Sequence, residues 1–345
     1  MKIILYLNTL RFLRFSQILF LIINRLYRPS HKLVRPSLKK RKQANQFLTP
    51  CKKRTLKESN FFFNFFKKDG SLEEIDWQNE NLNKLEIYNL HYFNEILTGN
   101  EEFSFDSVLN LIDDWINKNY KVKLVGWDPY PTSLRIVNWI KWDLLNNKFL
   151  EYQKISLFNQ GLYLEKTLEK HLRGNHLFAN AKALIFLGFY FEGKDSDRFR
   201  KKGLSILHEQ IEEQILSDGG HFELSPMYHL IILERLLDAH NFAKAIGDDF
   251  ELVLKSYAVK MTGLALNWKD LDRIPMMQDS AYNIALSVSD ILEYSKRLLE
   301  QDYPSKSNDL MDSGYRRLDS GNYTLFANVG SIRPSYQPGH AHADE

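Results

Sequence analysis

The chain has 345 residues, of which 44% are hydrophobic and 26% charged, a composition typical of a globular protein with a sizeable core. Its single cysteine, Cys51, excludes an internal disulfide framework and any metal site that needs several cysteines of this chain. Of the 46 Lys and Arg residues, fifteen precede Glu58, the first acidic residue, so the rest of the chain holds 31 basic against 43 acidic residues. Such an acidic body argues against nucleic acid as a partner, because phosphate binding needs basic charge on the folded domain.

Residues 1–57 form a basic N-terminal segment and linker. Leu, Ile, Phe and Tyr dominate residues 3–27, but three arginines interrupt them, and roughly 20 apolar residues are needed to span a bilayer. Small residues of a signal-peptide cleavage site do not follow. We predict an amphipathic, cationic helix that either packs on the main domain or makes a peripheral contact with anionic lipid through residues 1–28. Residues 29–57, which are basic and contain three prolines, are expected to be an irregular linker.

Residues 58–312 carry the apolar periodicity of a long series of helices. We predict helices at about 84–98, 105–119, 132–147, 151–170, 176–192, 197–216, 226–246, 249–266 and 280–300. Short connections between successive helices favour antiparallel α-hairpins packed on one another, in either a solenoid or a closed toroid. The lack of a repeat of fixed length weakens the solenoid alternative.

The pattern changes after Asp312 to that of two short β-strands, at 315–319 and 322–329, around Ser320-Gly321. Two strands with one hydrophobic face need further partners for stability. Residues 313–345 are therefore expected to be only the start of a β domain, and the chain is expected to be a fragment or a truncated product.

Four segments place polar, aromatic and glycine residues together at the ends of predicted helices, at 127–135, 173–180, 218–229 and 337–344. In the first, Trp127 and Tyr130 either pack between helices, with Arg135 in an ion pair, or hold a sugar ring and its acidic substituent. In the second, Asn175 and His176 open a helix. Asn175 is then either an N-cap or, with His176, part of a carboxylate site assisted by the helix dipole. The alternative for His176 is an ordinary surface residue.

The third segment starts a helix at Ser225-Pro226 and places Tyr228 in its first turn. Tyr228 is either an ordinary packed tyrosine or, with Glu223, His221 and His229 close by in sequence, a phenol whose pKa its neighbours shift.

In the fourth segment, His340, His342 and Asp344 alternate, so an extended strand would place them on one face. This row is typical of a metal ligand or of an acid/base group, and the alternative is a solvated turn.

With these segments in this order, the chain resembles the heparinase II/III family of polysaccharide lyases, including related alginate lyases, from about Trp127 onward. The motifs that carry the resemblance are Pro129-Tyr-Pro-Thr-Ser-Leu-Arg-Ile-Val-Asn-Trp139, Gly174-Asn-His-Leu177, Asp218-Gly-Gly-His-Phe-Glu-Leu-Ser-Pro-Met-Tyr228 and Gly339-His-Ala-His-Ala-Asp344. The resemblance implies a mainly α fold, an incomplete (α/α) toroid followed by the start of an antiparallel β-sandwich. It also implies β-elimination on a polysaccharide that contains uronic acid.

The resemblance implies roles for individual residues. Asn175 and His176 would neutralise the uronate carboxylate, which is required before the proton on C5 can leave. Tyr228 would take that proton or return one to the leaving O4, with His340 as the partner base or acid. His342 matches a position that binds structural zinc in several relatives, with co-ligands expected beyond residue 345. The remaining expected substrate-binding residues are Trp127, Tyr130, Arg135 and Glu223.

The expected partner is an acidic polysaccharide. The elimination chemistry is expected to need no cofactor. A structural zinc or calcium ion in the β-sandwich is kept as an option. The acidic body predicts local recognition of a carboxylate and a substrate less charged than heparin. Two alternatives remain: a non-catalytic or modifying factor in the synthesis of a bacterial surface polysaccharide, and an inactive truncated product. A cytoplasmic or membrane-peripheral location is favoured over secretion.

Overall fold

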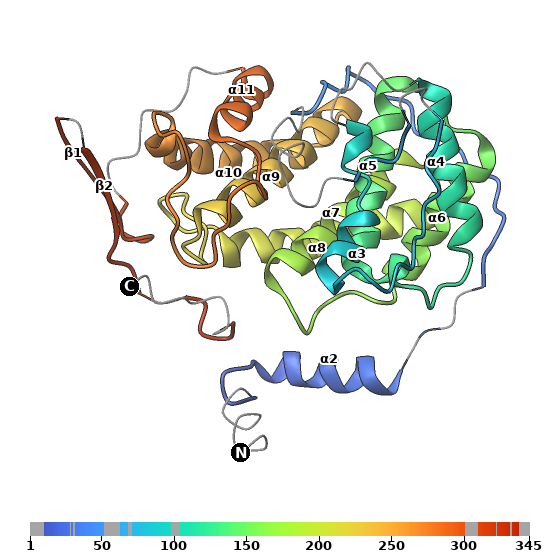
Figure 1. Ribbon diagram of the computed structural model, residues 1–345, viewed down its shortest axis with the longest axis horizontal. Coiled ribbons are helices and arrows are strands. Elements are labelled where there is room, and N and C mark those ends of the chain that lie inside the picture. The colour runs from blue at the N-terminus through green and yellow to red at the C-terminus, as the bar shows by residue number, and fades with distance from the viewer. Residues whose placement is uncertain are drawn as a thin grey trace.

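The computed structural model describes residues 10–27, 29, 32–51, 63–67, 71–97, 104–300, 310–321, 323–331 and 333–337 (Figure 1). Its α-helices are α2 (Phe15–Leu26), α3 (Lys84–Leu90), α4 (Phe105–Lys118), α5 (Pro129–Asn146), α6 (Glu151–Leu164), α7 (Gly174–Tyr190), α8 (Lys194–Gln214), α9 (Pro226–Ile246), α10 (Phe250–Ala265) and α11 (Val288–Leu299). Short 3₁₀ helices are η2 (Glu95–Leu97), η3 (Val125–Trp127) and η4 (Leu266–Trp268), and the strands are β1 (Tyr315–Ser320) and β2 (Tyr323–Asn328). The predicted mainly α fold is confirmed.

Helix boundaries follow the capping chemistry. Helix α9 has the predicted bounds because the Ser225 hydroxyl accepts a hydrogen bond from the first turn, Pro226 stands at the first helical position, and Gly247 ends the helix in the left-handed conformation. The expected helix at 280–300 begins later, where Ser287 caps α11. The expected helix at 84–98 is wrong in length, since the chain leaves the helix after Leu90 and resumes as η2.

The helices form two layers. Helices α5, α7 and α9 pack side by side in the interior, while α6 and α8 cover α7 and both α10 and α11 cover α9. Every residue of α7 except His176 is buried. A helix that is apolar on all sides requires neighbours on all sides, and the outer helices supply them.

Two glycines allow α7 and α8 to approach closely. A Cβ atom on Gly188 of α7 would lie 2.6 Å from the backbone nitrogen of Arg200, and one on Gly203 of α8 would lie 2.9 Å from the carbonyl oxygen of Ala181. Both distances are far below van der Waals contact, so the close packing of α7 on α8 requires that neither position carries a side chain.

The expected linker is irregular where it is described, and it is packed on the helical body. The Arg41 amide donates to the Tyr190 carbonyl at 2.7 Å, and the Asn45 amide donates to the Ala245 carbonyl at 2.8 Å. The ammonium group of Lys40 lies 2.5 Å from the Asp143 carboxylate. Residues 32–51 therefore tie the ends of α7 and α9 together.

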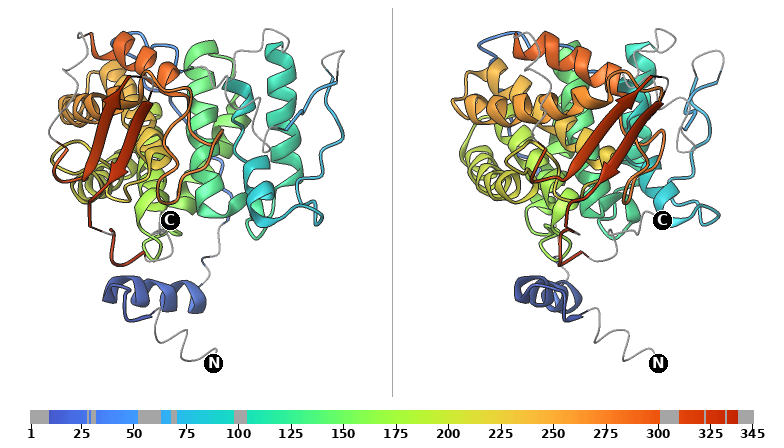
Figure 2. Two further views of the ribbon diagram at one scale, coloured as in Figure 1. Left: turned by 60° about the vertical axis from the view of Figure 1, so that its left-hand side comes forward. Right: turned by 90° about the vertical axis from the view of Figure 1, so that its left-hand side faces the viewer.

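Strands β1 and β2 form an antiparallel hairpin beside the α9–α10 end of the body (Figure 2). The Asp218 carboxylate accepts hydrogen bonds from the Ser313 amide at 2.7 Å and from its hydroxyl at 2.8 Å. The Tyr315 ring packs edge-on against Trp268, with 5.9 Å between ring centroids. Asp218 thus connects the helical body to the segment that leads into the hairpin.

Candidate active site

The first turn of α7 presents Asn175 and His176. The chain enters this turn through two residues with positive φ, Arg173 at 60° and Gly174 at 50°. Positive φ is uncommon for a residue with a side chain and is often found at functional sites. Arg173 occupies the cap position and Asn175 the second helical position, so the expectation that Asn175 is an N-cap is wrong.

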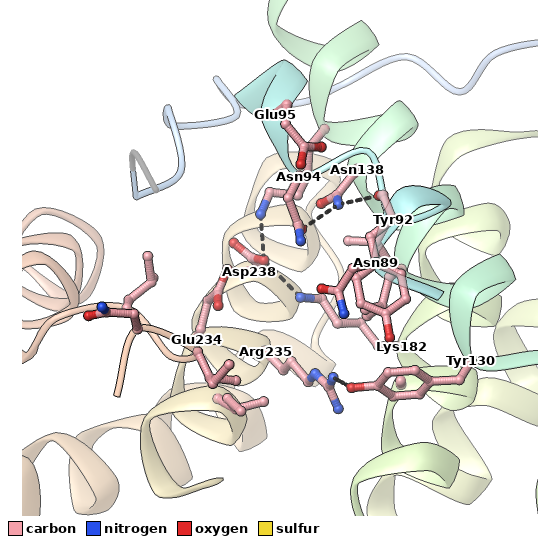
Figure 3. A pocket seen from close by; sticks show the side chains of 18 residues that line it. Asn89, Tyr92, Asn94, Glu95, Tyr130, Asn138, Lys182, Glu234, Arg235 and Asp238 are labelled. Carbon is pink, nitrogen blue, oxygen red and sulfur yellow. Dashed lines mark hydrogen bonds and ion pairs between the residues drawn. The ribbon is translucent and has the colours of Figure 1, made fainter. Parts of the chain in front are cut away.

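Asn175 is held by two side chains from other helices. The guanidinium of Arg235, on α9, donates to the side-chain oxygen of Asn175 and also to its backbone carbonyl, the latter at 2.8 Å. The Asn175 amide nitrogen donates to the hydroxyl of Tyr130, on α5, at 3.1 Å. Arg235 also donates to that hydroxyl, at 2.9 Å (Figure 3). The three groups close a ring of hydrogen bonds that fixes which end of the carboxamide carries the donor.

His176 is oriented by a carboxylate and an aromatic ring. Its Nδ1 lies 3.0 Å from a carboxylate oxygen of Glu169, and its ring lies 4.3 Å from the Tyr130 ring, centroid to centroid. The side chain of His176 is 35% exposed, whereas that of Glu169 is 7% exposed. The second Glu169 oxygen accepts from Asn180 at 3.0 Å. The imidazole is therefore accessible while its orienting partner is fixed in the core.

Tyr228 stands in the first turn of α9, as predicted. Its ring stacks on His221 with 6.2 Å between centroids. Burial, with smaller contributions from Glu223 and Asp279, raises the pKa of the Tyr228 phenol, while the charge of Arg235 partly opposes the shift. Tyr228 and Arg235 are seven residues apart and thus lie on the same side of α9.

A pocket of about 130 Å³ adjoins this group between α5, α7 and α9 (Figure 3). Tyr130 and Arg235 line it, and its other polar lining residues are Asn89, Tyr92, Asn94, Glu95, Asn138, Lys141, Lys182, Glu234, Asp238 and Asn283. The ammonium groups of Lys141 and Lys182 lie 2.8 and 2.7 Å from the same oxygen of Asp238. Burial lowers the pKa of Lys182 to about 8, since one carboxylate cannot compensate two buried cations fully.

Three of the residues expected to bind substrate are in the core. Arg135 has 0% exposure, lies over the Trp115 ring at 3.8 Å and donates to Gln160 at 2.9 Å. Trp127 donates its indole N–H to the Asn119 carbonyl at 2.7 Å, and both Trp127 and Glu223 are buried. These positions correct the expectation for Arg135 and Trp127, because both side chains are buried and their polar groups donate to other core residues. Trp127 packs as its alternative predicts, whereas Arg135 donates to neutral groups and, among the described residues, forms no ion pair. Glu223 acts on Tyr228 through its charge.

His229 and the C-terminal set of His340, His342 and Asp344 are the remaining residues that the sequence marks as candidates. His229 faces away from the pocket, since its Nε2 lies 3.0 Å from the Met261 carbonyl and its ring packs on Trp268. His340, His342 and Asp344 lie outside the described residues. Within the residues described, no three His, Cys, Asp or Glu side chains are grouped so as to hold a metal ion.

Comparison with known proteins places this geometry in a family. The family described as heparinase II/III N-terminus matches residues 25–297, and the one described as heparinase II/III-like, C-terminal, matches residues 302–345. The chain belongs to the heparinase II/III family. Its helical body with a short antiparallel sheet is accordingly an incomplete toroid followed by the start of a sheet domain.

Individual relatives are similar over part of their length. A heparin-sulfate lyase of Bacteroides stercoris is 25% identical over 218 residues, and the match covers 51% of this chain and 32% of the relative. One of Pedobacter heparinus is 30% identical over 188 residues, and the match covers 50% of this chain and 28% of the relative. The chain therefore spans about a third of these relatives. A crystal structure of heparinase III matches with a TM-score of 0.57 and 18% identity, covering 92% of this chain and 58% of that one.

Two members of the site were missed by sequence reasoning. Arg235 is detectable in retrospect, because it follows Tyr228 by two helical turns in a helix predicted with the right bounds. Glu169 precedes His176 by seven residues of irregular chain, and nothing in the sequence pattern indicates that its carboxylate turns back to the imidazole.

Proposed function

We propose that this family member cleaves a polysaccharide containing uronic acid by β-elimination. The observation that carries the proposal is the convergence of Tyr130, Asn175 and Arg235, from three different helices, beside the partly exposed His176. Heparin-sulfate lyases among the relatives support the polysaccharide as substrate class.

The reaction requires that the carboxylate on C5 be neutralised before the C5–H bond breaks. Arg235 donates to the side-chain oxygen of Asn175, so the amide nitrogen of Asn175 is the end available as a donor to a substrate carboxylate. His176 lies beside it on the same turn, and the N-terminus of α7 adds the positive end of the helix dipole. Donors that bind the enolate-like state more tightly than the ground state accelerate proton removal.

The protonation state of Tyr228 favours one of its two expected roles. A raised pKa keeps the phenol protonated at neutral pH. A protonated phenol can give its proton to O4 as the C4–O4 bond breaks and the C4–C5 double bond forms. The C5 proton then goes to a separate base, and we assign that role to His340, which the resemblance implies as the partner base or acid.

The test is incubation of the full natural protein with heparin, heparan sulfate and alginate, followed by ultraviolet absorbance of the unsaturated uronate and by mass spectrometry. Elimination yields fragments whose masses sum to that of the parent, whereas hydrolysis adds one water for each cut. An unsaturated product that is lost in Asn175→Ala supports the proposal. Binding of the glycan without cleavage would instead identify a non-catalytic binding protein.

A further inference from the structure

Helix α2 is attached to the body by its polar side. The Gln17 amide donates to the His171 carbonyl at 3.1 Å, and the Asn24 amide lies 2.9 Å from the His171 ring nitrogen. Gln17 is 1% exposed. Two polar positions of α2, Gln17 and Asn24, thus lie on the side of the helix that contacts the protein, the reverse of the usual arrangement in a surface helix.

The opposite side of α2 is an apolar ridge that consists of Phe15, Leu19, Ile22 and Leu26. These residues are spaced by four, three and four positions, so they share one face of the helix. Their exposures are 79%, 42%, 52% and 82%. Four large apolar side chains in one exposed row are typical of a surface that contacts another protein or a membrane.

Helix α2 is too short to cross a bilayer. Its twelve residues extend about 18 Å, against about 30 Å for the hydrocarbon core. Among the described residues no helix is long and apolar enough to span a membrane. Figure 1 shows α2 lying across the lower end of the body, an arrangement in which its whole length can lie flat on a surface.

The charge around the ridge selects the partner. The described residues 10–27 contain Arg11, Arg14 and Arg25 and no acidic residue, and Arg14 pairs with Glu213 of the body. A groove of about 560 Å³ beside α2 is lined by Lys170, Arg173, Arg198, Lys201 and Lys202, with Glu209 as its only acidic lining residue among those described. Carboxylates neutralise three of these five basic residues: Arg173 pairs with Glu209 and Glu213, while Arg198 and Lys202 both pair with Glu165. Within the described part of the chain, Lys170 and Lys201 form no ion pair, so they supply the uncompensated positive charge of the groove. Two copies of so basic a surface repel each other, whereas an anionic surface is attracted.

We propose that α2 docks this protein on an anionic lipid membrane, with the apolar ridge in the boundary between headgroups and acyl chains and the basic groove against lipid phosphates. The heparinase II/III N-terminal match begins at residue 25, so almost all of α2 lies before the matched region. Association of this kind depends on both buried apolar area and electrostatic attraction.

The experiment is co-sedimentation of the full protein with vesicles of phosphatidylglycerol and phosphatidylcholine in equal amounts, and with vesicles of phosphatidylcholine alone. We expect binding to the anionic vesicles that weakens as salt is raised, and at least tenfold weaker binding of Leu19→Ser/Ile22→Ser. The matched control is Leu85→Ser/Leu252→Ser, because Leu85 and Leu252 are 53% and 65% exposed on other helices. Lys201→Glu, in the groove, is expected to weaken binding about fivefold or more.

Several results would overturn the proposal. It fails if the wild type does not bind anionic vesicles, or if Leu19→Ser/Ile22→Ser binds as well as the control variant. It also fails if light scattering without lipid finds a dimer that the ridge variant converts to a monomer, since the ridge would then be covered by a second copy. Circular dichroism of each variant shows whether the body remains folded.

Discussion

Arg235 donates to Asn175 twice, once to its side-chain oxygen and once to its backbone carbonyl. The contact joins α9 to the first turn of α7, and it places the guanidinium next to the hydroxyl of Tyr130 as well. The planar guanidinium thus donates to three acceptor oxygens, two of Asn175 on α7 and one of Tyr130 on α5. We infer that Arg235 is a positioning residue, which holds the Asn175 carboxamide in the orientation needed to receive a carboxylate.

Arg235→Lys is therefore expected to lower kcat by roughly tenfold to a hundredfold, because a single ammonium group cannot reproduce the planar set of donors. The variant should fold normally, as judged by its thermal unfolding. Arg200→Lys is the control, since Arg200, on α8, also pairs with a carboxylate, that of Asp248, and its side chain is 43% exposed. An Arg235→Lys enzyme with wild-type kcat would show that the orientation of Asn175 does not depend on the guanidinium.

Asp238→Asn should destabilise the protein by about 3–5 kcal/mol, because it leaves Lys141 and Lys182 buried without their shared carboxylate. Asp238 is 1% exposed, so solvent cannot replace the lost partner. Chemical denaturation at neutral pH measures the change. A loss below about 1 kcal/mol would mean that Glu234 or solvent compensates both lysines.

The pH dependence of stability tests the same cluster through Lys182. Its pKa in the folded protein is about 8, below the ordinary value of 10.5, so the unfolded chain binds the proton more tightly. The Lys182 contribution to the stability of the wild type therefore rises between about pH 8 and 10.5, by about 3 kcal/mol for a shift of this size. Lys182→Met lacks this contribution. Denaturation of both proteins across that range should show the wild type gaining stability relative to the variant, and parallel curves would contradict the lowered pKa.

Gly203→Ala tests the close approach of α7 and α8. The added methyl group would lie 2.8 Å from a side-chain carbon of Ile185 and 2.9 Å from the Ala181 carbonyl oxygen. Overpacking of this kind costs about 1–3 kcal/mol. Thermal unfolding should show a lower Tm for Gly203→Ala and little change for Ser205→Ala, which alters an exposed position of the same helix.

The helical body was predictable because its signals are local. Ser225 and Pro226 start α9 by capping chemistry that acts within one turn, and the apolar periodicity of 105–119 gives α4 within one residue. Local signals do not predict a helix end that is set by tertiary contacts. The break after Leu90 is such a case, since Phe93 takes a positive φ and buries its ring against Trp77 and Trp139.

The candidate site was predictable only in part. Asn175 and Tyr228 stand at helix starts that the sequence marks with Gly174 and Pro226. Arg135 illustrates the limit, because an arginine in an aromatic segment has the same sequence pattern whether it faces a ligand or, as here, lies over the Trp115 ring in the core. Burial depends on which helices pack together, which residue patterns alone do not specify.

The most direct test of the proposed chemistry is the rate at which Tyr228→Phe forms unsaturated uronate from the polysaccharide that the wild type cleaves. The substitution removes only the hydroxyl that would protonate O4, and Tyr257→Phe on α10 is the matched control. We expect the Tyr228→Phe rate to fall about a hundredfold or more while the control retains the wild-type rate. A Tyr228→Phe rate equal to that of the wild type would contradict the account, because the phenol would then have no part in the elimination.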